Sequence, residues 1–140
     1  MARSDLEALL NVLIPMADKM LAEQGEFYPF AAAMDSSDQI SPWAAQLEDE
    51  HPSAQDVFDK LVAGLRDSAD GLKATGVCFD GRVTPPDSDD ETDAVCICLE
   101  DRDGEAIDVF VPYRIDADSG QIEYGELFAV RGEPAVFASA

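Results

Sequence analysis

The stretch TDAVCICLE, residues 92–100, contains the uninterrupted apolar run AVCICL. A strand with one face in water alternates apolar and polar residues, whereas a strand buried on both faces does not. Residues 109–111, VFV, repeat the continuous pattern in the next strand-like segment. We therefore predict a sheet that is covered on both faces. The second cover is either the C-terminal segment GEPAVFASA, residues 132–140, folding back on the sheet, or a second copy of the chain in a symmetric dimer.

Three further strand-like segments surround this stretch, and short polar turns join them. Residues 101–104, DRDG, and residues 116–120, DADSG, have the composition of hairpin connections, so the strands that they join are predicted to run antiparallel. The three segments are ATGVCFDGRVT (74–84), EAIDVFVPYRI (105–115) and QIEYGELFAV (121–130).

The N-terminal segment has the apolar spacing of a helix. Ser4 and Glu7 match a capping box, apolar residues then recur at helical spacing, and Gly25 ends the pattern. Pro15 removes a backbone donor in the middle of this helix, which predicts a kink or a restart there.

A hairpin and a second helix follow. The segment GEFYPFAAAMDSSDQI, residues 25–40, predicts a first strand from Phe27 to Ala33, with its rings facing the helix and the core, then a polar turn and a second strand. Ser53 is the predicted N-cap of the second helix and Gly71 its predicted stop.

These elements predict a single α+β domain over residues 1–140 in the order α-β-β-α-β-β-β-β. We expect both helices on one face of a mainly antiparallel sheet, in a profilin-like or GAF-like arrangement. The length suits one domain, and no linker divides the chain.

The charge of the chain restricts its partners. With 30 Asp plus Glu against 9 Lys plus Arg, the formal net charge is -21. Such a field repels phosphate backbones and anionic membrane surfaces, so we expect neither nucleic acid nor membrane as a partner. Solubility, salt adaptation and attraction to a basic protein partner remain as explanations of the acidity.

The location is predicted to be the cytoplasm. No apolar run approaches the roughly 18 residues that span a bilayer, and the N-terminus lacks the pattern of a signal peptide. The three cysteines are an odd number without a paired framework, which suits a reducing compartment.

No catalytic motif accompanies the reactive side chains. His51 is the single histidine and lies at the entry to the second helix without a nucleophile motif nearby. Cys96 and Cys98 point to one face of a strand and Cys78 belongs to a neighbouring strand, one ligand short of a zinc site, so core packing is expected. We predict no catalytic residue, no cofactor and no metal ligand, and favour a non-enzyme.

Two acidic turns are candidate cation sites. Neither meets the glycine and glutamate requirements of an EF-hand loop, so we interpret both as solvated turns. They are the loop PPDSDDETD (85–93), which carries Asp87, Asp89, Asp90, Glu91 and Asp93, and the turn that carries Asp116, Asp118 and Gly120.

The aromatic residues are expected mainly in the core or at a subunit interface, because the strands already require apolar faces. Tyr and Trp also form interfaces and line ligand pockets. Tyr28, Trp43 and Tyr124 are therefore the candidate residues for an interface or for a pocket between helix and sheet.

Three motifs, GEFYPFAAAMD (25–35), RVTPP (82–86) and IEYGELFA (122–129), resemble those of a family of small, conserved, uncharacterised acidic bacterial proteins. The resemblance extends over most of the chain. It implies a bacterial origin, and it carries over no activity and no functional residue.

Three functions remain as hypotheses. The first is a non-enzymatic protein–protein interaction module, dimeric and comparable to an immunity protein or an inhibitor, that binds a basic partner. The second is a small-ligand-binding or sensory domain with its pocket between helix and sheet. The third, the least favoured, is a divalent-metal-dependent hydrolase that uses the loop of Asp87, Asp89, Asp90 and Asp93.

Overall fold

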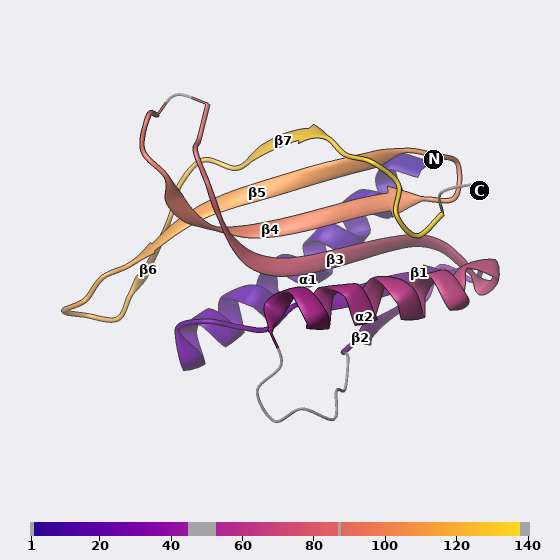
Figure 1. Ribbon diagram of the computed structural model, residues 1–140, viewed down its shortest axis with the longest axis horizontal. Helices are drawn as coiled ribbons and strands as arrows, with labels where there is room; N and C mark the ends of the chain where they lie inside the picture. Colours follow the sequence, from indigo (N-terminus) through magenta and orange to yellow (C-terminus); the bar gives the residue numbers. More distant parts are fainter. Residues whose placement is uncertain (1, 45–52, 87, 138–140) are drawn as a thin grey trace.

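The computed structural model describes residues 2–44, 53–86 and 88–137 (Figure 1). Two helices, a short 3-10 turn and seven strands make up these residues, and the α+β fold class is confirmed. The elements are α1 (Ala2–Gln24), β1 (Phe30–Asp35), β2 (Ile40–Trp43), α2 (Ala54–Asp67), η1 (Ala69–Gly71), β3 (Leu72–Val83), β4 (Thr92–Asp101), β5 (Ala106–Ile115), β6 (Ile122–Tyr124) and β7 (Phe128–Arg131).

The strands form one antiparallel sheet in the order β2-β1-β3-β4-β5-β6, and β7 pairs with the first half of β5. The single strand predicted over 121–130 is therefore two strands. Tyr124 pairs with Tyr113 and Phe128 pairs with Phe110, so between these pairs three residues on one side oppose two on the other. Pro112 lies between them on β5 and has no N–H to donate to the neighbouring strand, which explains the break in the ladder.

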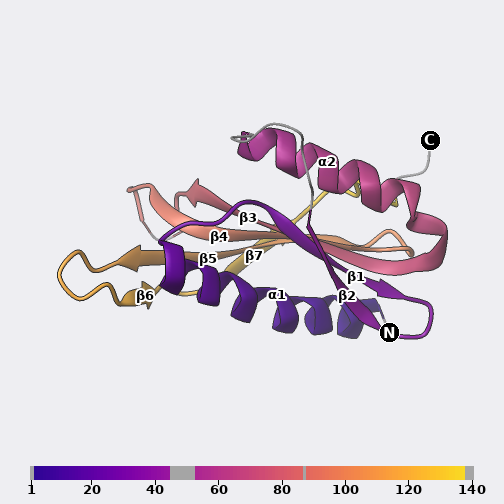
Figure 2. The ribbon, with the colours of Figure 1, turned by 90° about the horizontal axis from the view of Figure 1, so that it is seen from below.

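The helices cover opposite faces of the sheet, as Figure 2 shows, so the prediction of both helices on one face is wrong. In β1, Ala32 and Met34 pack in the α1 core, whereas Ala31 and Ala33 pack beneath α2. Because β1 is apolar at both alternating sets of positions, it requires a cover on each side.

The second face is completed by residues 132–137 of the C-terminal segment, which fold back on the sheet as predicted, and residues 138–140 lie outside the described residues. Val136 is buried with the apolar face of α2, and Phe137 packs beside it. The carboxylate of Glu100 on β4 holds the segment by accepting backbone N–H groups at 2.7 to 3.1 Å from Ala135, Val136 and Phe137. Within the described residues, this face is covered without a second copy of the chain.

Helix α1 begins at Ala2 and runs through Pro15 as one helix, so Ser4 lies inside it and the predicted restart does not occur. Gly25, with a φ of 77°, donates to the Leu21 carbonyl at 2.8 Å and ends the helix as predicted. The cap of α2 is also confirmed, because the Asp56 N–H donates to Ser53 Oγ at 3.1 Å.

The opening aromatic segment divides between core and surface. Phe27 and Phe30 are buried against α1 with ring centroids 5.7 Å apart, as predicted. Tyr28 is 53% exposed, so its predicted place in the core is wrong. Strand β1 begins only at Phe30, because Pro29 cannot donate to a ladder.

Candidate functional site

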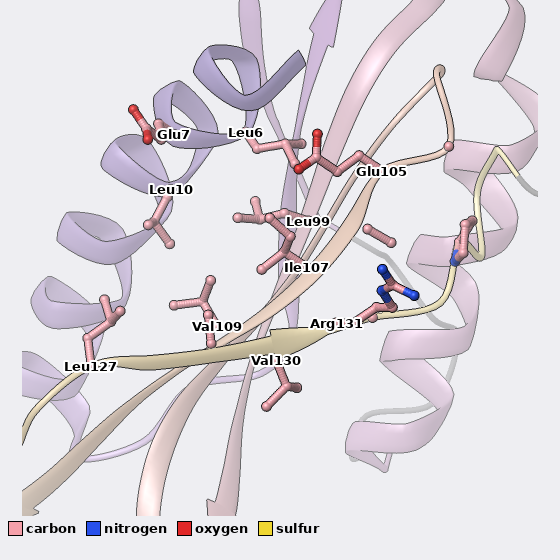
Figure 3. Close-up of a pocket in the computed structure, with 15 residues that line it drawn as sticks. Leu6, Glu7, Leu10, Leu99, Glu105, Ile107, Val109, Leu127, Val130 and Arg131 are labelled. Atoms are coloured by element: carbon pink, nitrogen blue, oxygen red, sulfur yellow. The ribbon is translucent and has the colours of Figure 1, made fainter. Parts of the chain in front are cut away.

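A groove lies between α1 and the outer strands, and we call it the α1–β7 groove. Its volume is about 770 Å³. In Figure 3 the apolar side chains of α1 and β5 face one another across it, and Leu127 lies at its end beside α1. The apolar side chains that line it include Leu6, Leu10, Leu99, Ile107, Val109 and Leu127.

The groove exists because α1 does not reach the edge of the sheet. The helix packs mainly against β1, β3 and β4, and β5 and β7 extend beyond it. Leu6 and Leu10 lie one turn apart on the helix, and Ile107 and Val109 lie two residues apart on β5, so each pair shares one face. The apolar side chains of α1 and of β5 therefore extend beyond the contact between the helix and the sheet, and they line the groove.

Charged residues lie at the rim of the groove. Glu7 and Glu105 are its acidic lining residues, and Arg131 is the single basic residue among its lining residues in the described chain. This surface belongs to a chain with a net charge of -21. The groove therefore combines an apolar floor with an anionic surrounding.

A second, smaller cavity of about 330 Å³ lies on the opposite face, between α2, the sheet and the C-terminal segment. Glu100, Asp108 and Glu133 contribute carboxylates to its lining. The Cys98 thiol also lines it, and burial raises the pKa of this thiol to about 12, so it stays protonated and is a poor nucleophile.

The three residues predicted for an interface or pocket do not come together at either cavity. Trp43 lies beneath α2, where its ring approaches Gly64. Tyr124 lies on the side of α1, since its hydroxyl donates to Asp18 Oδ1 and burial raises its pKa. Tyr28 is exposed near the end of α1. The signal that could have indicated the groove is a pair of apolar residues, Leu127 in the break between β6 and β7 and Val130 in β7.

The cysteines are packing residues. Cys78 is buried on the α1 face, where Cys96 and Cys98 of β4 cannot reach it, because Cys78 pairs with Ile97 and therefore points the opposite way. Burial raises the pKa of Cys78 and raises that of Cys96 to about 12. All three are free thiols.

The acidic turns have local roles. Arg82 pairs with Glu91 at 2.7 Å and with Asp93 at 3.2 Å across the first turn. Asp116 Oδ1 accepts the Asp118 N–H at 2.9 Å, which closes the second turn as the predicted hairpin. In the part of the chain that the structure describes, no group of three His, Cys, Asp or Glu side chains could hold a metal ion. His51 and Asp87 lie outside the described residues.

Comparisons of the chain with protein-family models, with curated proteins and with solved structures find no match. The resemblance to a bacterial family and the profilin-like or GAF-like topology therefore stay predictions. Neither helix of the described chain has the length and apolarity that a membrane-spanning segment requires.

Proposed function

We propose that the protein is a non-enzymatic, acidic protein–protein interaction module that binds a basic segment of another protein in the α1–β7 groove. The observation that carries the proposal is an apolar groove on the surface of a chain with a net charge of -21. Apolar contacts supply affinity, and the surrounding negative field attracts a cationic partner and accelerates association.

The exposed apolar side chains at this site support a docking function. Leu127 is 46% exposed and Val130 is 49% exposed, and both belong to the outer edge of the molecule beside the groove. Burial of apolar surface contributes roughly 25 cal/mol per Å², so two such side chains stabilise a complex by a few kcal/mol before ordering costs are counted.

The other predicted properties remain part of this proposal. A cytoplasmic location agrees with the free thiols, and the negative field argues against nucleic acid and anionic membrane as partners. The homodimer is predicted as one possible cover for the second face of the sheet. This reason no longer applies, because α2 and the C-terminal segment cover that face. Analytical ultracentrifugation at two salt concentrations tests whether a dimer forms.

Affinity capture with the full chain tests the proposed function. The chain is immobilised, cell extract is applied at low salt, and bound proteins are eluted with a salt gradient and identified. Leu127→Glu should lose a basic partner that the wild-type chain retains. The matched control is Ile115→Glu, because Ile115 is 36% exposed but lies outside the groove. Equal capture by wild-type chain and Leu127→Glu would contradict the proposal.

A small-ligand-binding domain is the second candidate, because the groove volume of about 770 Å³ lies within the range of ligand sites. A ligand present at a hundred times its Kd should stabilise the chain by about 2.7 kcal/mol in a thermal-shift screen. If no metabolite changes the Tm, this candidate loses support. If neither calcium nor magnesium changes the Tm, the least favoured candidate, a metal-dependent hydrolase, loses support.

A further inference from the structure

We propose that the occupant of the α1–β7 groove is an extended segment of alternating apolar and basic residues that adds to the sheet as a strand beside β7. This inference rests on the proposed function and specifies the conformation and the chemistry of its partner. Four observations support it. They are the β7 residues that direct their backbone groups outward, the difference between the two edges of the sheet, the apolar groove, and the carboxylates of Asp108 and Glu133 on the α2 side.

Strand β7 directs backbone groups to an open edge. The Gly132 N–H donates to the Ala106 carbonyl at 3.0 Å, and the register pairs Val130 with Asp108. In an antiparallel pair the hydrogen-bonded residues alternate, so Val130 bonds to β5 and the backbone groups of Ala129 and Arg131 point away from it. Among the described residues, β7 pairs with no strand except β5.

The opposite edge of the sheet carries a proline at an outward position. The Asp35 N–H donates to the Gln39 carbonyl at 2.9 Å, which places the outward groups of β2 on Ile40 and Pro42 by the same alternation. Pro42 has no N–H, and proline on an edge strand is a common protection against unwanted pairing. Strand β7 contains no proline, so the two edges differ in their capacity to accept a strand.

The groove determines which kind of side chain the added strand needs on the face that is turned to α1. Ala129 lies opposite Val109 in the register and therefore shares the face that is turned to α1. A strand beside β7 would direct every second side chain to the α1 face of the sheet, toward the groove in which Figure 3 shows Leu10, Val109 and Leu127. These side chains should be apolar.

Carboxylates determine which kind of side chain the added strand needs on the face that is turned to α2. Val130 points away from α1 in Figure 3, and its partner in the register is Asp108. Asp108 and Glu133 both line the cavity on the α2 side, where Arg131 is the one basic lining residue in the described chain. The side chains of an added strand that alternate toward α2 therefore meet carboxylates, which lysine or arginine would pair with. The net charge of -21 also disfavours a second copy of this chain as the occupant.

The test uses the full chain and the synthetic peptide KVKVKVK, with EVEVEVE as the charge-reversed control. Binding is followed by fluorescence anisotropy, and hydrogen exchange of the Ala129 and Arg131 amides is followed by NMR. The lysine peptide should bind, its binding should weaken as salt rises, and it should slow the exchange of both amides.

Ala129→Pro removes one outward N–H and should weaken binding about tenfold or more, whereas Ala129→Ser keeps it and should bind like wild type.

A second pair of variants tests the charges. Asp108→Asn with Glu133→Gln should weaken the lysine peptide and flatten its salt dependence. Asp67→Asn with Asp70→Asn removes equal charge at the C-terminal end of α2 and in η1, from residues that line neither cavity, and should change little. If Ala129→Pro does not fold, the amide protection in the wild-type chain decides the question alone.

Each failure has a distinct meaning. Lysine-peptide binding without protection of the two amides would overturn strand addition and leave the groove as the binding site of the proposed function. No binding of the lysine peptide would overturn this inference, and capture of a basic partner that Leu127→Glu abolishes would still support the proposed function. Concentration-dependent protection without any peptide would also overturn the inference, because it would identify a second copy as the occupant.

Discussion

Glu100 is the residue on which the cover of the second face depends. Its carboxylate is buried and accepts N–H groups from three consecutive residues, Ala135 to Phe137, of the C-terminal segment. Hydrogen bonds to a charged group stabilise more than neutral ones, and an acceptor lost in a buried place leaves its donors unpaired. One side chain thus links the centre of the sheet to the end of the described chain.

Glu100→Gln should lower the free energy of unfolding by roughly 1–3 kcal/mol, because an amide offers one acceptor oxygen in place of two. Urea denaturation measures this loss, and hydrogen exchange should show faster exchange of the Val136 and Phe137 amides. Glu126→Gln, at an exposed position, is the control and should stay within about 0.5 kcal/mol of wild type. Equal stability of the two variants would contradict the role of Glu100.

Asp80 is expected to make the stability of the folded chain depend on pH. Burial raises its pKa above the usual 3.8, although its carboxylate accepts the Tyr113 hydroxyl at 2.6 Å. An acid with a raised pKa in the folded state contributes stability below its unfolded pKa, and this contribution is lost as pH rises through the folded pKa. The stability of wild type relative to Asp80→Asn should therefore fall as pH rises from below 3.8 towards neutrality, measured by urea denaturation. A constant difference would contradict this effect.

A glycine in β3 lets a leucine of α1 and a leucine of β4 pack directly over the strand. A Cβ built at Gly76 would lie 2.6 Å from Leu13 Cδ1 and 2.9 Å from Leu99 Cδ2, closer than real contacts allow. Helix α1 therefore rests on β3 at a position where the strand has no side chain.

Gly76→Ala should destabilise the chain by roughly 1–3 kcal/mol, because the helix or the leucines must shift to admit the methyl group. Chemical denaturation measures the change. Gly71→Ala is the matched control, since no atom lies within 4 Å of the position that its added methyl group would take, and it should be nearly neutral. A neutral Gly76→Ala would mean that α1 does not pack closely against β3.

The sequence predicted some of these elements and not others, for physical reasons. The run AVCICL requires burial on both faces, and the return of residues 132–137 over the sheet follows from that requirement. The alanines of β1 are apolar on both sides, so they could not reveal which helix covers which face. The groove depends on the strand order and on the break opposite Pro112, which are tertiary properties that hydrophobic periodicity does not report. Tyr28, Trp43 and Tyr124 do not gather at one site for the same reason.

The whole molecule is governed by its net charge of -21. Few cations offset the acids, and the ion pairs of Arg82 and Arg114 lie on the surface, where such pairs contribute little. Repulsion among the carboxylates therefore opposes the compact state, and salt screens it over about 10 Å at 0.1 M.

Sodium chloride should accordingly raise the Tm, with most of the gain at low concentration. Differential scanning calorimetry across a sodium chloride series measures it, and an uncharged osmolyte at equal osmolality is the control for excluded-solute effects. A Tm that falls with salt would show that attractive ion pairs, and not repulsion, dominate the surface.

The decisive question for the whole molecule is where a basic, alternating segment binds. Methyl NMR of the full chain, titrated with KVKVKVK, follows the groove side chains Leu10, Ile107 and Leu127 together with remote methyls of α2. We expect saturable shifts at the groove methyls and little change at Leu61 and Leu65 on the buried face of α2. Saturable shifts confined to α2, or no shifts at the groove while the peptide binds, would contradict the α1–β7 groove as the docking site.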